Sequence, residues 1–278
     1  MIKVKIKFYG TAGTEGIPGI FCKCEVCKNS RASGGRNIRT RTQALVDDTL
    51  LIDFPPDTYF HVLRNGLPLA DIHHCVITHN HGDHFYPTDL AMRGGKHAHG
   101  LAAPLNVYGT RAVKARFGEN ITQPKENAVI CQEISAFAPF EADGFRITPL
   151  AANHHPESDP VFYLIEKAGK AIMYANDTGY FPDDTWRYLE NNSPKLSFVS
   201  FDCTFGINTG PNNRHMGLPE VIKARKRLME MGCVSDETLC FLNHFSHNHF
   251  IHDAYDEIVE AASGYGFRVT WDGLEVEF

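Results

Sequence analysis

The sequence predicts an α/β (α+β) fold in which two mixed β-sheets are flanked by helices. Three observations predict it. Short runs rich in β-branched and aromatic residues recur along the 278 residues, as is typical of strands. Amphipathic patterns typical of helices lie between some of these runs. The order is strands first, then strands mixed with helices, then strands again, which favours two sheets with outer helices over a simple strand–helix alternation. We expect one domain over residues 1–278.

The strand-like runs support the two sheets. Two of them contain turn sequences typical of hairpins: VDDT joins Ala44–Val46 to Leu50–Ile52, and KAGKA joins Phe162–Glu166 to Ala171–Tyr174. In chain order, the runs are VKIKFYG (4–10), QALVDDTLLIDF (43–54), HCVITH (74–79), LNVYG (105–109), FRITPL (145–150), VFYLIEKAGKAIMYAND (161–177), LSFVSFD (196–202), LCFLNH (239–244) and FRVTWDGLEVEF (267–278).

Helical patterns support the outer layers. The clearest covers 218–232, where Gly232 is a typical helix end. The segments 183–192 and 254–266 follow the same pattern, and HFYPTDLAMRGG at 84–95 suggests a further helix. In 218–232, the apolar residues expected to share one face are Leu218, Val221, Ile222, Leu228 and Met229.

Composition and charge exclude several classes of protein. The formal net charge is −6, so no overall basic field attracts nucleic acid, and we expect no nucleic-acid partner. No apolar stretch approaches the roughly eighteen residues that a membrane span needs. The N-terminus alternates lysine with apolar residues, which is a strand pattern and not a signal-peptide block. We therefore expect a cytoplasmic protein without a membrane partner.

Histidines cluster in this sequence, and the clusters follow predicted strands. All but one of the fifteen histidines lie at 73–84, 97–99, 154–155, 215 and 244–252. Apolar runs lead directly into His79, His154, Asp177 and His244. A strand end is rigid on one side and open on the other, so it can aim a ligand from a distant part of the chain at one point.

The loop THNHGDH at 78–84 has the composition of a metal site. In an extended segment, His79 and His81 point the same way and can bind one ion. Gly82 permits a sharp turn, after which Asp83 and His84 can reach a second ion. Further ligands are available at the strand ends, in His154, Asp177 and His244, and the Asp177 carboxylate can bridge two ions. The alternative is a histidine-rich surface loop.

THNHGDH resembles the His-x-His-x-Asp-His signature of the metallo-β-lactamase-fold hydrolases. GTAGTEGIPGIFCKCEVC (10–27), NRHMGLPE (213–220) and LNHFSH (242–247) further resemble the PhnP-like cyclic phosphodiesterases of the carbon–phosphorus lyase pathway. The resemblance spans nearly the whole chain. It implies an αββα metallo-β-lactamase sandwich with the metals at one edge of the two sheets, and it makes a homodimer plausible.

The resemblance also implies a ligand set. It assigns His79, His81 and His154 to one metal, Asp83, His84 and His244 to the other, and Asp177 to a bridging position. The neighbouring His155 is an alternative to His154, which we prefer because the strand continues into it. Imidazoles with carboxylates suit zinc, manganese or iron. We expect catalytic roles for Asp83 and for His215, whose position in the family is that of a general acid; an ordinary loop histidine is the alternative.

The motif CKCEVC at about 22–27 indicates a separate zinc site. Cys22, Cys24 and Cys27 supply three thiolates, and three thiolates with one imidazole make a closed tetrahedral zinc site. The resemblance nominates His247 as the fourth ligand of this structural zinc. Thiols without a metal are the alternative. We expect the remaining cysteines to be small core residues: Cys75, Cys131, Cys203, Cys233 and Cys240.

For several other polar residues, the sequence indicates a functional role less strongly. Arg39 and Arg41 could approach a substrate phosphate, or they could line a solvated strand edge. His97 and His99 lie in a glycine-containing segment that could form a lid over the site, although surface positions are the simpler reading. We expect surface or hydrogen-bonded edge positions for His61, His73, His74, His249 and His252.

These observations predict a binuclear-metal phosphodiesterase that acts on a small phosphate ester, cyclic esters included. One alternative is an RNA-processing endonuclease of the tRNase Z type, which the net charge of −6 disfavours. The other is a PqqB-like binding or carrier protein that keeps the cysteine zinc site but not a working catalytic site.

Overall fold

The computed structural model describes residues 3–121 and 128–278. In this part of the chain, the strands form two seven-stranded mixed sheets with the orders β14-β1-β2-β3-β4-β5-β6 and β13-β12-β11-β10-β9-β8-β7. The strands are β1 Lys5–Gly10, β2 Gln43–Val46, β3 Leu50–Ile52, β4 His74–Val76, β5 Leu105–Gly109, β6 Val129–Glu133, β7 Phe140–Ala142, β8 Phe145–Ala151, β9 Val161–Lys167, β10 Lys170–Ala175, β11 Phe198–Asp202, β12 Leu239–Asn243, β13 Arg268–Val269 and β14 Glu275–Glu277.

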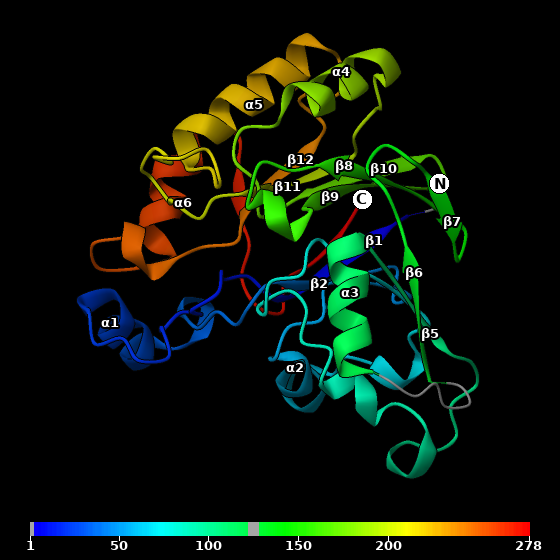
Figure 1. The fold of residues 1–278 in the computed structure, drawn as a ribbon. Helices are drawn as coiled ribbons and strands as arrows, with labels where there is room; N and C mark the ends of the chain where they lie inside the picture. Colours follow the sequence, from blue (N-terminus) through cyan, green and yellow to red (C-terminus); the bar gives the residue numbers. More distant parts are fainter. Residues whose placement is uncertain (1–2, 122–127) are drawn as a thin grey trace.

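Helices cover the outer face of each sheet (Figure 1). Helices α2 and α3 pack on the first sheet, and α4, α5 and α6 pack on the second. The helices are α1 Glu25–Ser33, α2 Thr58–Asn65, α3 Arg111–Asn120, α4 Asp183–Asn192, α5 Leu218–Glu230 and α6 Asp256–Ala262.

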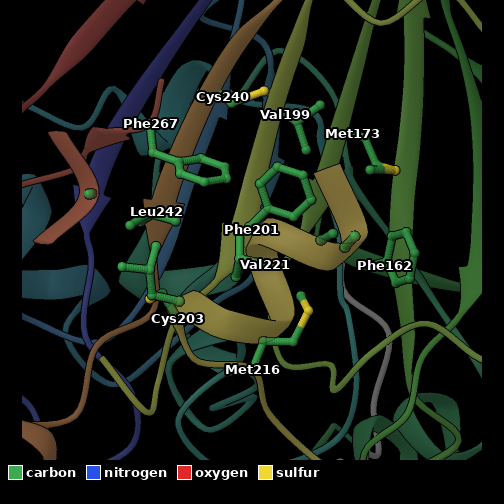
Figure 2. Close-up of a cluster of buried hydrophobic side chains, with 14 of the residues drawn as sticks. Phe162, Met173, Val199, Phe201, Cys203, Met216, Val221, Cys240, Leu242 and Phe267 are labelled. Carbon is green, nitrogen blue, oxygen red and sulfur yellow. The ribbon is translucent and has the colours of Figure 1, made fainter. Parts of the chain in front are cut away.

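Three buried apolar clusters hold these layers together. The middle cluster joins the facing sides of the two sheets, for example through Phe8, Tyr174 and Phe198. A second cluster joins the outer side of the second sheet to its helices, and Figure 2 shows Val221 of α5 in it beside Phe201 of β11. The third lies between the first sheet and α2 and α3. This helix–sheet–sheet–helix order confirms the predicted αββα sandwich.

Both predicted hairpins are present. Strands β2 and β3 pair antiparallel with Ala44 opposite Ile52, and β9 and β10 pair antiparallel with Ile165 opposite Ile172. In each sheet, the strands beyond the hairpin continue in parallel: β3 to β6 in the first and β10 to β13 in the second. Carboxyl ends of parallel strands meet at one sheet edge, and this arrangement creates the site described below.

Two helix predictions need correction. The segment 84–95 does not form the predicted α-helix. Phe54 accepts a hydrogen bond from the backbone N–H of Tyr86 and donates one to the carbonyl of His84, so Phe85 pairs with Phe54 in an isolated β-bridge. Only a 3₁₀ turn at Asp89–Met92 follows. The prediction for 218–232 is confirmed as α5, except that Met229 is 36% exposed and Ala224 takes its place on the buried face.

Among the described residues, none of the helices has both the length and the apolar character that a membrane crossing requires.

Candidate metal centre and active site

The predicted ligands converge from the ends of strands in both sheets. His79 follows β4 of the first sheet, whereas His154, Asp177 and His244 follow β8, β10 and β12 of the second. Asp177 and His244 have positive φ values of 52° and 62°, which non-glycine residues seldom adopt. The chain therefore turns sharply directly after these strands. Such conformations cost about 1–3 kcal/mol each and cluster at functional sites.

His79, His81 and His154 form the first group of possible metal ligands. One nitrogen from each ring lies within 4.8 Å of the others. The Nε2 atom of His154 is 3.2 Å from Nδ1 of His81. The Nε2 atom of His79 is buried and has no hydrogen-bond partner among the described residues. A buried nitrogen without a partner is costly, and a cation between these rings would satisfy it.

Asp83, His84, Asp177 and His244 form the second group, again within 4.8 Å. The Asp177 Oδ2 atom contacts Nε2 of His84 and lies 3.1 Å from Nε2 of His244. Asp177 also faces the first group, with Oδ1 3.7 Å from Nε2 of His154. The carboxylate of Asp177 thus lies between the two groups, where it could bridge two ions.

The protonation behaviour of these groups also suits a metal site. Burial lowers the pKa of His79 well below its usual value and that of His154 to about 4, so both rings are neutral. For His84, burial acts in the same direction, but Asp177, Asp53 and Asp83 outweigh it and raise the pKa. A divalent cation can replace the protons that these closely packed carboxylates attract.

The structure distinguishes between the two neighbouring histidines. The His154 side chain is 4% exposed and points at the first group. The His155 side chain is 33% exposed, and its two nitrogens face Glu157 and Arg214 at 3.3 and 3.2 Å. His154 is therefore the residue that the fold brings to the possible ligands.

Two further carboxylates, which the sequence analysis did not single out, contact ring nitrogens of His84 and His215. Asp53 Oδ2 lies 2.7 Å from Nδ1 of His84, and Asp202 Oδ2 lies 3.0 Å from Nδ1 of His215. Such partners fix the orientation of a ring and raise its basicity. Each aspartate ends an apolar strand, LLID or LSFVSFD, so the signal that found Asp177 could have found them too.

His215 lines the pocket without belonging to either group described above. The Oδ1 atom of Asp202 accepts hydrogen bonds from the backbone N–H groups of Thr204 and Met216, which leaves Oδ2 for His215. Burial alone would lower the pKa of His215, but Asp202 and then Asp177 raise it to about 9. With Nδ1 held by Asp202, Nε2 is the nitrogen left to carry a proton to a ligand. His215 also lies within 4.8 Å of Asp177, Asp202 and His244 in an overlapping cluster that could hold a metal.

The cysteine loop at 22–27 contacts His247, which lies three residues after His244. The sulfur atoms of Cys22 and Cys24 lie 3.8 and 3.5 Å from Nδ1 of His247, and Cys27 completes a group within 4.8 Å. A Cβ on Gly19 would approach Nε2 of His247 to 3.0 Å, so the loop and the His247 ring are closely packed there. All eight cysteines are free thiols, and Cys75, Cys203, Cys233 and Cys240 are buried as expected, whereas Cys131 is only partly buried.

The pocket over the two groups has a volume of about 480 Å³. Besides the predicted residues, the sequence analysis missed several polar side chains in its walls: Glu15, Asn80, Arg116 and Asn248. They lie on loops and on α3; Asn80 and Glu15 fall inside the motifs at 78–84 and 10–27, whereas Arg116 and Asn248 lie outside any motif.

Arg39, Arg41 and the two histidines of the predicted lid do not line this pocket in the described part of the chain. Arg39 is 1% exposed and donates to Thr11 Oγ1 and the carbonyl of Thr270, so both sequence readings of it were wrong. The guanidinium lies 4.5 Å from the Phe245 ring centroid. Arg41 pairs with Asp57 at 3.1 Å. His97 borders a separate apolar hollow with Tyr59 and Met92.

Comparisons with known proteins place this geometry in a family. The model of the β-lactamase superfamily domain matches residues 49–241. Ribonuclease Z of Staphylococcus saprophyticus is 24% identical over 197 residues, which are 68% of this chain and 59% of that protein. Ribonuclease Z of Staphylococcus aureus is 27% identical over 162 residues, which are 57% of this chain and 50% of that protein. The chain therefore spans only about half to three-fifths of these relatives.

Solved structures resemble the fold over its full length. A diphosphatase of the PhnP family has a TM-score of 0.75 at 22% identity, over 100% of this chain and 98% of that one. Zinc-bound PqqB of Methylobacterium extorquens has a TM-score of 0.72 at 22% identity, over 98% of this chain and 99% of that one. The short form of human tRNase Z has a TM-score of 0.66 at 14% identity, over 98% of each chain. At these identities the likeness shows the fold and not the substrate.

Proposed function

The chain belongs to the β-lactamase superfamily; on this basis we propose that it is a metal-dependent hydrolase, and more narrowly a phosphodiesterase acting on a small phosphate ester, cyclic esters included. The observation that carries the proposal is Asp177, whose carboxylate lies between the group of His79, His81 and His154 and the group of Asp83, His84 and His244. Two ions held this close would supply a nucleophile at neutral pH and neutralise charge on a phosphoryl group.

The protein's own residues have separate tasks in this proposal. The imidazoles of the two groups and Asp83 would hold the ions, and Asp53 would keep the His84 ring in place. His215 is charged at neutral pH because Asp202 raises its pKa, so its Nε2 can donate a proton to the departing alkoxide.

The cysteine group belongs to the same proposal as a structural zinc site. Gly13 and Gly19 allow its loop to pack against His244 and His247, because a Cβ added at these positions would lie 3.2 Å from His244 Cε1 and 3.0 Å from His247 Nε2. A zinc ion bound by three thiolates and His247 would brace the wall of the pocket. Zinc, manganese or iron would suit the imidazole and carboxylate groups.

A substrate panel tests this proposal. Protein loaded separately with manganese, zinc and iron is assayed on a linear diester, a ribose 2′,3′-cyclic phosphate, a phosphomonoester and a lactone. We expect hydrolysis of the diesters and little activity on the monoester or lactone. Activity on the lactone alone would contradict a phosphodiesterase, and a metal-loaded protein without any activity would favour a PqqB-like carrier.

RNA processing of the ribonuclease Z type is the second candidate, because the curated relatives that match the sequence carry that name. The net charge of −6 weighs against it, since tRNA binding depends strongly on basic surface. Cleavage of a precursor tRNA at its 3′ end, at a rate above that on a small diester, would favour this candidate over the first.

A further inference from the structure

The wall of the metal pocket carries one arginine among its described residues, Arg116 of α3. Its Nη1 atom donates a hydrogen bond of 2.7 Å to the backbone oxygen of Asn80, the residue between His79 and His81. Its Nη2 atom is so close to the metal-binding loop that a Cβ on Gly82 would lie 3.5 Å from it. The half-buried guanidinium is thus fixed against this loop without contacting a metal-ligand side chain in the described structure.

Arg116 has no carboxylate partner within residues 3–121 and 128–278, whereas Arg41 is paired with Asp57. The acidic side chains of the pocket have other partners: Asp83 and Asp177 contact His84, and Glu15 contacts Ser246. A guanidinium has five N–H donors, and the carbonyl of Asn80 takes one of them.

We propose that Arg116 is a specificity-determining residue that binds a second anionic group of the substrate, a phosphate or carboxylate separate from the reacting phosphoryl group. This inference rests on the proposed phosphodiesterase function. Arginine binds such groups through two parallel N–H bonds, which gives direction as well as affinity. The cavity of about 480 Å³ exceeds the room that a reacting phosphoryl group alone requires. The selected esters would therefore carry more negative charge than a simple diester.

Two esters with the same scissile bond test the proposal. They are 4-nitrophenyl thymidine 5′-phosphate and its 3′-phosphorylated form, which differ only in the second anionic group. We expect wild-type protein to favour the 3′-phosphorylated ester by about ten- to a hundredfold in kcat/KM, as a bond between charged groups allows. In Arg116→Gln this ratio should fall to about twofold or less, and Arg116→Lys should restore only part of it.

The matched control is Arg111→Gln, an exposed arginine on the same helix that does not line the pocket. It should keep the wild-type ratio. Three results would overturn the proposal: no preference in wild type, an unchanged ratio in Arg116→Gln, or the same fall in ratio in Arg111→Gln. An equal loss on both esters in Arg116→Gln would leave the ratio unchanged and would mean contact with the reacting phosphate or a structural role.

A binding measurement separates failure of this proposal from failure of the proposed function. Titration calorimetry on metal-loaded protein compares thymidine 3′,5′-bisphosphate with thymidine 5′-monophosphate. Tighter binding of the bisphosphate in wild type, lost in Arg116→Gln, supports the anion site even if neither ester is hydrolysed, in which case only the phosphodiesterase function fails. Equal binding of both nucleotides by wild type and variant contradicts the anion site even if both esters are hydrolysed.

Discussion

Replacing Asp202 by asparagine should change the pH dependence of hydrolysis in a calculable way. Asp202 is the main reason that the pKa of His215 is about 9, although burial acts against it. Without that charge we expect the pKa to fall to about its ordinary value of 6.5, because burial lowers it while Asp177 still raises it. A general acid works in its protonated form, so activity is present below its pKa and lost above it. At pH 7.5 the protonated fraction of His215 should therefore fall about tenfold, whereas at pH 6 most of it should remain.

The assay is a pH profile of kcat on an alkyl phosphodiester, recorded for wild type and Asp202→Asn with metal content measured in both. The asparagine oxygen can still accept the hydrogen bonds that Thr204 and Met216 donate to Asp202, so the loop should keep its shape. We expect the alkaline limb to move toward acid, with a loss of about tenfold at pH 7.5 that largely disappears at pH 6. A loss that is the same at every pH, in protein with full metal content, would refute the reasoning.

The remaining predictions concern the acid and the two metal sites. His215→Ala should keep the metal ions and lose about a hundred- to ten-thousandfold on an alkyl diester, but much less on a nitrophenyl diester, whose leaving group needs no proton; an equal loss on both would assign His215 to binding instead. Mild EDTA treatment should abolish hydrolysis yet leave about one zinc per chain, because a closed thiolate site exchanges slowly; elemental analysis without zinc in folded protein would remove the structural assignment. Cys24→Ser should lower the melting temperature and the zinc content together, and an unchanged value of either would count against Cys24 as a ligand.

Four of the possible metal ligands could be found from the sequence because each one follows an apolar strand, whereas the division of the ligands into two groups came from the family resemblance. His79, His154, Asp177 and His244 come from four strands, and parallel strand ends meet at one sheet edge. The choice of His154 over His155 also followed from the strand pattern, and the structure places the His154 ring beside His81. Their roles as ligands stay a prediction, as do the single domain and the homodimer.

The environments of residues that contact distant parts of the chain could not be predicted from a local strand pattern. Arg39 looked like a surface residue, but Thr11, Phe245 and Thr270 surround it from both ends of the sequence. The segment 84–95 has a helix-like composition, yet Phe85 pairs with Phe54 in a β-bridge. Arg116 reaches the pocket only because α3 packs beside the metal-binding loop, and no local pattern indicates that contact.

The most direct test of the central claim is anomalous diffraction from crystals of metal-loaded protein, collected at the absorption edge of the added metal. We expect two neighbouring peaks on either side of the Asp177 carboxylate, one among His79, His81 and His154 and the other among Asp83, His84 and His244. A further zinc peak should lie among the cysteines and His247. A single peak at Asp177, or a peak held by Asp202 and His215 in place of one of the pair, would contradict the proposed binuclear centre.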